Sequence, residues 1–145
     1  MKRLAILSTF LLLIIGSAKA DNDVAITVSE LPRKAQEMVR AFFSKNDISY
    51  VKKERDLWDK SYEVIFTNGE KVDFTGNGEW KEISCTYSSV PPQLIPAKIK
   101  AQIARQYPSV KIIRIERDRN DYEVKLSNKL EVKFNKNFQI VDIDN

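Results

Sequence analysis

The feature that most constrains this chain is an internal repeat, because two stretches carry the same short motifs in the same order. The offset between matching motifs shortens along the chain, as short loop deletions would produce. The matching pairs are Leu31-Pro32 with Ile95-Pro96, Glu54-Arg55-Asp56 with Glu116-Arg117-Asp118, Tyr62-Glu63-Val64 with Tyr122-Glu123-Val124, and Val72-Asp73-Phe74 with Val132-Lys133-Phe134. The chain is therefore expected to fold one small unit twice, over residues 21–87 and 88–145.

Each unit begins with a pattern that predicts an amphipathic helix. Apolar residues recur at helical spacing in both units. They are Leu31, Ala35, Met38, Val39 and Phe42 in the first unit and Ile95, Ile99, Ile103 and Tyr107 in the second. Pro32 and Pro96 suit a first helical turn, where a missing N–H has no partner to lose, and Ser29 is the expected N-cap. These apolar stripes predict helix faces that pack on a core.

The remainder of each unit predicts short antiparallel strands. Residues 48–56 and 110–118 are the expected first strands, and Tyr62, Val64 and Phe66 alternate with polar residues in the next. Thr67-Asn68-Gly69-Glu70 predicts a tight hairpin, since Asn and Gly tolerate positive φ. In the second unit Asn128 and Asn137 are the expected left-handed residues. The predicted fold class is α+β, with two tandem repeats, each one helix packed on a four-stranded antiparallel sheet.

The first twenty residues have the three regions of a secretory signal peptide. Lys2 and Arg3 precede an apolar run over residues 4–16, and small residues precede a cleavage position after Ala20. The run is shorter than the roughly 20 residues that span a bilayer, so cleavage without stable membrane insertion is expected. No Cys follows the cleavage position for lipid attachment. Residues 1–20 therefore predict a periplasmic or secreted protein.

The composition argues against several classes of function. Cleavage would leave 21 Lys and Arg against 20 Asp and Glu, which is no basis for nucleic-acid binding. The chain has no His, so the commonest general base and metal ligand is missing. Cys85 is the single cysteine and has no imidazole to activate it. No catalytic residue, metal site or cofactor is therefore predicted, and the recurring carboxylates are interpreted as charges on the strand surfaces.

The residues singled out as candidates for binding are apolar side chains that the strand phase leaves outside the core. Ile65 and Trp80 are expected on the sheet face opposite the helices, with Trp58 in a loop and Tyr87 between the units. Aromatic residues among charged ones are typical of protein-recognition surfaces. The favoured hypothesis is a protein partner of unknown identity on the open sheet face. The alternative is a small molecule or envelope polymer bound in the groove between the units.

The repeated Leu/Ile-Pro helix, Tyr-Glu-Val hairpin and turn before an aromatic strand resemble the PepSY-like proteins. These exported bacterial proteins share the tandem-repeat architecture of the beta-lactamase inhibitor protein, and the resemblance covers nearly all of residues 21–145. The family's Asp-x-x-Gly-like turn is replaced here by Thr75-Gly76-Asn77-Gly78 and by Asn135-Lys136-Asn137-Phe138. The resemblance implies a binding or inhibitory role toward an extracytoplasmic protein.

Overall fold

The computed structural model describes residues 23–145, so the predicted signal peptide at residues 1–20 lies outside the described part. The strands are β1 (Val24–Ile26), β2 (Ile48–Arg55), β3 (Lys60–Phe66), β4 (Lys71–Thr75), β5 (Trp80–Ser84), β6 (Ile112–Arg117), β7 (Asp121–Leu126), β8 (Glu131–Asn135) and β9 (Ile140–Asp144). The helices are α1 (Arg33–Phe42) and α2 (Ala97–Gln106), with short 3-10 helices η1 (Val28–Glu30) and η2 (Pro92–Leu94).

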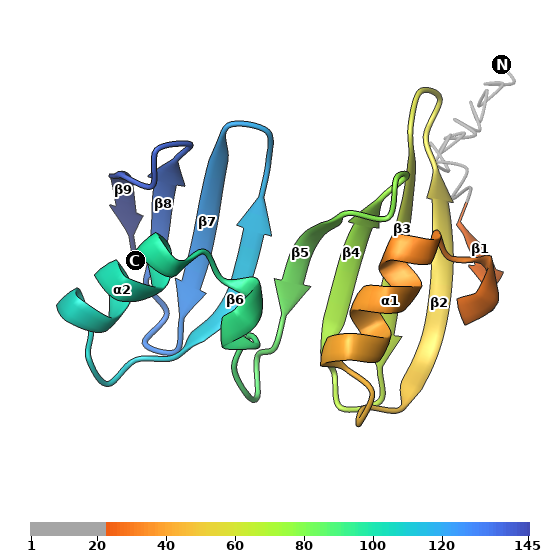
Figure 1. Ribbon diagram of the computed structural model, residues 1–145, viewed down its shortest axis with the longest axis horizontal. Helices are drawn as coiled ribbons and strands as arrows, with labels where there is room; N and C mark the ends of the chain where they lie inside the picture. The colour runs from red at the N-terminus through yellow and green to blue at the C-terminus, as the bar shows by residue number, and fades with distance from the viewer. Residues whose placement is uncertain (1–22) are drawn as a thin grey trace, which may run out of the picture.

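All nine strands form one antiparallel sheet whose spatial order follows the sequence from β1 to β9 (Figure 1). The predicted pair of four-stranded sheets, one per repeat, is therefore wrong. β5 pairs with β6, which places Ile83 opposite Ile115 and leaves both side chains 0% exposed. Without this pairing, the backbone groups on one side of each strand would be unpaired. The sequence predicted eight strands, and the additional one is β1, which pairs with β2 through Val24, Ala25 and Ile26.

Both α-helices lie on the same side of the sheet, α1 over the strands of the first half and α2 over those of the second (Figure 1). The predicted apolar stripes face the sheet, with Ala35 and Ile99 both fully buried. Two details differ from the sequence prediction. The first stripe ends on Phe43, which is 3% exposed, rather than on Phe42. Helix α1 begins directly after Pro32, and Ser29 lies within η1 instead of capping it.

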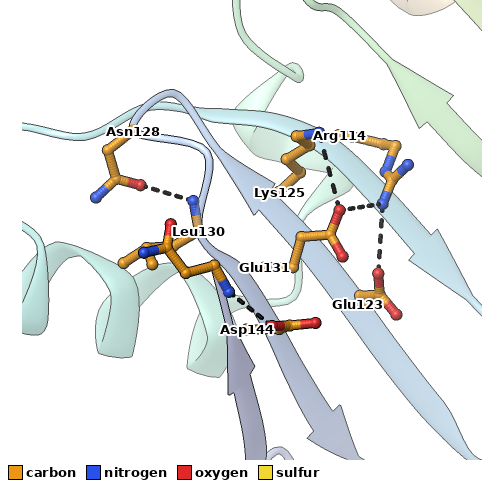
Figure 2. Close-up of polar contacts among 8 residues, drawn as sticks. Arg114, Glu123, Lys125, Asn128, Leu130, Glu131 and Asp144 are labelled. Atoms are coloured by element: carbon orange, nitrogen blue, oxygen red, sulfur yellow. Dashed lines mark hydrogen bonds and ion pairs between the residues drawn. The ribbon is translucent and has the colours of Figure 1, made fainter.

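The hairpin turns are as tight as predicted, but the residues with positive φ differ in the second half. Gly69 has a φ of 86°, and its N–H donates to the Phe66 carbonyl at 3.0 Å. In the turns of the second half, the residues with positive φ are Lys129, at 74°, and Phe138, at 60°. The prediction that Asn128 and Asn137 would take this conformation is wrong. Asn128 instead accepts a hydrogen bond from the Leu130 N–H through its side-chain oxygen (Figure 2).

The hydrophobic core lies between the helices and the sheet and runs through both halves. Its largest fully buried side chains come from the six strands β3 to β8, from α2 and from Cys85. The rings of Phe43 and Phe66 stack in this core with their centroids 5.1 Å apart. These side chains include Phe66, Phe74, Phe134, Ile83, Ile99, Ile115 and Leu126. Neither α-helix within residues 23–145 is long and apolar enough to cross a membrane. One face of the sheet is thus used for the core, and the other carries polar side chains.

Candidate functional site

The sheet face opposite the helices carries a row of carboxylates that crosses five adjacent strands. Side chains alternate between the faces along each strand, so residues between the buried positions point away from the helices. The strand register places five acidic residues directly opposite one another, and they are called the acidic row here. The acidic row consists of Glu63, Asp73, Glu82, Glu116 and Glu123, on β3 to β7 in that order.

Lysines stand at both ends of the acidic row. Lys52 is opposite Glu63, and Lys133 is opposite Glu123. The Lys52 ammonium lies 2.9 Å from Glu54, 3.2 Å from Asp23 and 3.6 Å from Glu63. The hydrogen bond to Glu54 is the main reason that the pKa of Lys52 is raised. The β2 end of the row is therefore held by a lysine that stays charged.

The β7 end is partly neutralised by cations from the neighbouring row of side chains. Arg114 places Nη2 3.3 Å from Glu123 and 3.4 Å from Glu131, and Lys125 approaches Glu131 at 3.8 Å (Figure 2). Burial, followed by the charge of Glu131, still raises the pKa of Glu123. The cations at this end therefore offset only part of the cost of placing these carboxylates together.

The centre of the acidic row has little compensation. Asp73 has Lys71 at 4.0 Å, and neither Glu82 nor Glu116 forms an ion pair within residues 23–145. Burial, followed by the charge of Glu63, raises the pKa of Asp73 to about 6. Directly opposed like charges destabilise a sheet. The charge on Asp73 is therefore unfavourable in the free protein, and an approaching cationic group would reduce that cost.

The acidic row was not predicted from the sequence. Glu63, Glu116 and Glu123 were noted as recurring carboxylates, and the basic neighbours along the chain suggested that each would face a cation across the strands. The β5–β6 register decides otherwise, because it sets Glu82 against Glu116. A signal was available in the sequence, since Asp73, Glu82 and Glu116 share the phase of polar positions between buried ones. Its interpretation needed the order of the strands.

Trp58 is the most exposed of the predicted binding residues, at 95%, and it lies in the β2–β3 loop. Its neighbour Leu57, which was not among the predicted binding residues, is 90% exposed. The loop is held by the Asp56 N–H, which donates to the Asp59 carbonyl at 2.9 Å, and by the Asp56 carboxylate, which accepts from the Leu57 N–H at 2.8 Å. Two large apolar side chains are thus presented to solvent on an ordered turn.

Ile65 and Tyr87 lie in different surroundings from Trp58. Ile65 is half-buried on the open face, where it follows Glu63 by two residues and stands opposite Lys71. Tyr87 is 86% exposed, and its ring lies beside the β3–β4 turn at Gly69. Trp58 lies in the loop before β3 and Tyr87 lies beside the turn that follows β3, so the two residues lie at opposite ends of this strand. The predicted residues do not form one cluster.

Trp80 does not lie on the open face, and this part of the sequence prediction is corrected. A bulge between Asp73 and Phe74 sets Trp80 opposite Phe74, on the helix side, where it is 8% exposed. The Arg117 guanidinium covers its ring at 3.8 Å from the centroid, and Arg117 Nε donates to the Trp80 carbonyl at 2.6 Å. Glu79 then pairs with Arg117 at 3.3 Å. Trp80 is a packing residue at the junction of the two halves.

A hollow of about 820 Å³ lies beside this junction and is lined by the β4–β5 turn and the β6–β7 loop. Its lining includes Trp80, Arg117 and Arg119. The face of the indole ring that could stack on a ligand is already occupied by Arg117. The hollow therefore offers charged groups and backbone, without a free aromatic platform.

The Cys85 thiol is buried and poorly reactive in the folded protein. Cys85 is 1% exposed, and burial, followed by the charge of Glu70, raises its pKa to about 12. The buried Glu70 carboxylate accepts hydrogen bonds from the Asn46 side chain and, at 2.7 Å, from the Ser88 hydroxyl. Within residues 23–145, no three acidic or thiol side chains are grouped to hold a metal ion. The chemistry that the open face supports is the electrostatic recognition of cations.

Comparison with known proteins gives one family and a set of solved structures. Residues 60–142 match a family described as "Putative beta-lactamase-inhibitor-like, PepSY-like". A "putative periplasmic protein" from Bacteroides vulgatus is 48% identical, with a TM-score of 0.85, over 87% of this chain and 99% of that one. A "putative calcium-regulated periplasmic protein" from Bacteroides thetaiotaomicron gives the same four values.

A second Bacteroides vulgatus structure, a "putative periplasmic protein of unknown function", is 37% identical with a TM-score of 0.80. The match covers 85% of this chain and 99% of that one. No curated protein is significantly similar in sequence. The predicted location outside the cytoplasm is confirmed as periplasmic by these similarities.

Proposed function

The chain belongs to the PepSY-like, beta-lactamase-inhibitor-like family, as its motifs predicted, and on this premise we propose that it is a non-catalytic binding protein. It binds another periplasmic protein through the open face of its sheet. The partner presents a basic surface, and binding blocks that surface without any chemical turnover. Leu57 and Trp58 add apolar contacts from the end of the sheet.

The observation that carries this proposal is the uncompensated centre of the acidic row. Asp73, Glu82 and Glu116 stand directly opposite one another on three adjacent strands, with Lys71 at 4.0 Å as the nearest cation. A sequence under selection for stability alone would alternate charges at such positions. Lys or Arg side chains of a partner would supply the missing positive charge, which gives both affinity and orientation.

The apolar residues support a protein partner over a simple ion. Trp and Tyr are enriched among the residues that dominate protein interfaces, and charged rims mainly steer the encounter. Trp58 is free to become buried because it is 95% exposed in the unbound chain. Ile65, next to Glu63 on the open face, offers an apolar contact inside the charged surface.

The alternative of a small molecule in the groove between the halves has less support. The groove's only tryptophan is Trp80, and Arg117 covers its ring at 3.8 Å. The calcium regulation named for the Bacteroides thetaiotaomicron relative is said of that protein. Adding calcium as one condition of the binding experiment would show whether it affects this chain.

The experiment uses the mature protein, immobilised, to retain partners from a periplasmic extract, with retained proteins identified by mass spectrometry. The row variant is Glu82→Gln with Glu116→Gln, and Glu37→Gln on the exposed side of α1 is its matched control. The loop variant is Trp58→Ala, and Arg119→Ala, in the β6–β7 loop, is its control.

A specific partner should be retained by the wild type and both controls, and lost from the row variant and at high salt. At moderate salt, the Trp58→Ala variant should retain less of this partner than the wild type or the Arg119→Ala control does. Equal retention by the row variant and its control would overturn the proposal. Retention that depends on calcium, but not on the row, would assign the protein a different mode of binding.

A further inference from the structure

β9 forms one edge of the sheet, and the three-residue strand β1 forms the other. Within residues 23–145, β9 pairs with β8 alone. Ile140 packs against the core, but the other two apolar side chains of β9 remain in solvent, with Val141 56% exposed and Ile143 46% exposed. Natural edge strands usually carry charged side chains, especially Lys, or Pro to prevent pairing; β9 has no Lys or Pro, and its only charges are the acidic Asp142 and Asp144, which leave a basic strand free to pair. β9 therefore presents unpaired backbone groups together with apolar side chains.

Strand β5, the equivalent of β9 in the first half, shows how a second neighbouring strand buries the apolar side chains of such a strand. β5 follows β4 with the same register that relates β9 to β8, including a bulge at the matching place. Ile83 of β5 stands opposite Val72, as Ile143 of β9 stands opposite Val132. Ile83 is 0% exposed because β6 lies on its other side, whereas Ile143 has no such neighbour.

On the open face of the sheet, the residues beside β9 are mostly acidic, so a strand that pairs with β9 should carry basic side chains on that face. A hollow of about 160 Å³ lies beside β9, lined by four carboxylates and one ammonium group. Its lining residues are Glu123, Glu131, Lys133, Asp142 and Asp144. A strand added to β9 would point alternate side chains toward this hollow, and Lys or Arg there would meet a net negative charge. The intervening side chains would cover Ile143 and need to be apolar.

A second copy of this chain fits the edge poorly. Antiparallel pairing of two β9 strands would bring Asp142 and Asp144 of one copy close to the same residues of the other. Like charges at opposed or neighbouring cross-strand positions are unfavourable. A basic segment removes this repulsion and gains the contacts to Ile143 as well.

We infer that β9 is a strand-addition edge, which accepts an extended segment of another protein with alternating basic and apolar side chains. Main-chain hydrogen bonds would provide affinity, and the hollow and Ile143 would provide specificity. The hollow shares Glu123 with the acidic row, but the backbone edge of β9 and Ile143 lie outside the surface in the proposed function, which centres on Asp73, Glu82 and Glu116. The two can succeed or fail independently.

The test measures binding of fluorescent peptides to the mature protein by anisotropy. The probe alternates Lys and Val over seven residues. One control peptide has the same composition in blocks, and a second alternates Glu and Val. The protein variants are Ile143→Ser and the double change Asp142→Lys with Asp144→Lys, each checked for folding by circular dichroism. Glu82→Gln with Glu116→Gln serves as the variant of the other surface.

The alternating Lys–Val peptide should bind at least about tenfold more tightly than the block peptide, a difference of about 1.4 kcal/mol. Ile143→Ser should weaken it, and the double lysine variant should lose it and gain affinity for the Glu–Val peptide. The variant of the other surface should bind as the wild type does. Equal binding of the alternating and block peptides would show that binding depends only on the net charge of the peptide, and it would overturn the inference. A dimer in light scattering that Ile143→Ser dissociates would also overturn it, by assigning the edge to a second copy.

Discussion

Replacing Asp73 with Asn tests the repulsion within the acidic row, because it removes one charge and keeps the shape of the side chain. The Asp73 side chain is 18% exposed, and its Oδ1 atom is buried without a hydrogen-bond partner in the described chain. Burial and the charges of Glu63 and Glu82 raise its pKa from 3.8 to about 6, while Lys71 opposes the rise. Ionised Asp73 should therefore lower the free energy of unfolding at neutral pH.

The rise in pKa corresponds to about 3 kcal/mol at neutral pH, at roughly 1.4 kcal/mol per pH unit. Partial exposure and the loss of the attraction to Lys71 reduce the gain, so Asp73→Asn should stabilise the protein by about 1–2 kcal/mol. Because the folded pKa lies above the unfolded one, the folded state binds more protons between about pH 4 and 6. The cost of the charge is thus fully present above about pH 6 and disappears as the pH falls toward 4.

Urea denaturation followed by circular dichroism, repeated across this pH range, measures the difference between variant and wild type. That difference should be largest at neutral pH and shrink toward zero in acid, because titrating groups far from Asp73 contribute equally to variant and wild type. Glu37→Gln on α1, whose side chain is 56% exposed, controls for loss of a carboxylate in general. A variant no more stable than the wild type at neutral pH, or a difference that does not change with pH, would refute the reasoning.

Two further predictions concern packing and reactivity. Gly78→Ala should destabilise the protein by about 2–4 kcal/mol in urea denaturation, because φ is +83° and a Cβ would lie 2.8 Å from Pro32 Cβ. Gly69→Ala shares the positive φ but meets only the Tyr87 ring at 3.4 Å, so it should cost about 1 kcal/mol; equal costs would contradict this account. The Cys85 thiol should resist iodoacetamide in the native protein and react fully in denaturant, as mass spectrometry would show. Rapid native labelling would be inconsistent with its burial.

The local features of the fold were predictable because the forces that fix them act over a few residues. Helical spacing identified Ala35 and Ile99 as core residues, and Asn68-Gly69 predicted its hairpin. The joining of the halves was not predictable in this way. It depends on whether Ile83 meets Ile115, which are separated by the whole of η2 and α2. A pattern within one strand does not specify the neighbour across it.

The candidate site shows the same division. Exposure of Trp58 followed from its place in a loop, but a single bulge after Asp73 moved Trp80 from the open face into the core. Likewise the sequence displays each carboxylate of the acidic row, but only the strand order shows Glu82 facing Glu116. The register between strands therefore explains both differences: it buries Trp80, which was predicted to be exposed, and it aligns the carboxylates of the acidic row on the open face.

The strand order, identical to the chain order, also determines how this protein responds to a pulling force. β1 and β9 are the two outer strands, so tension between residues 24 and 144 acts across the sheet, along its hydrogen bonds. Such a load opens the ladders one strand at a time, as a zipper opens, instead of shearing all bonds of a strand at once. Mechanical resistance should therefore be low however stable the fold is in urea.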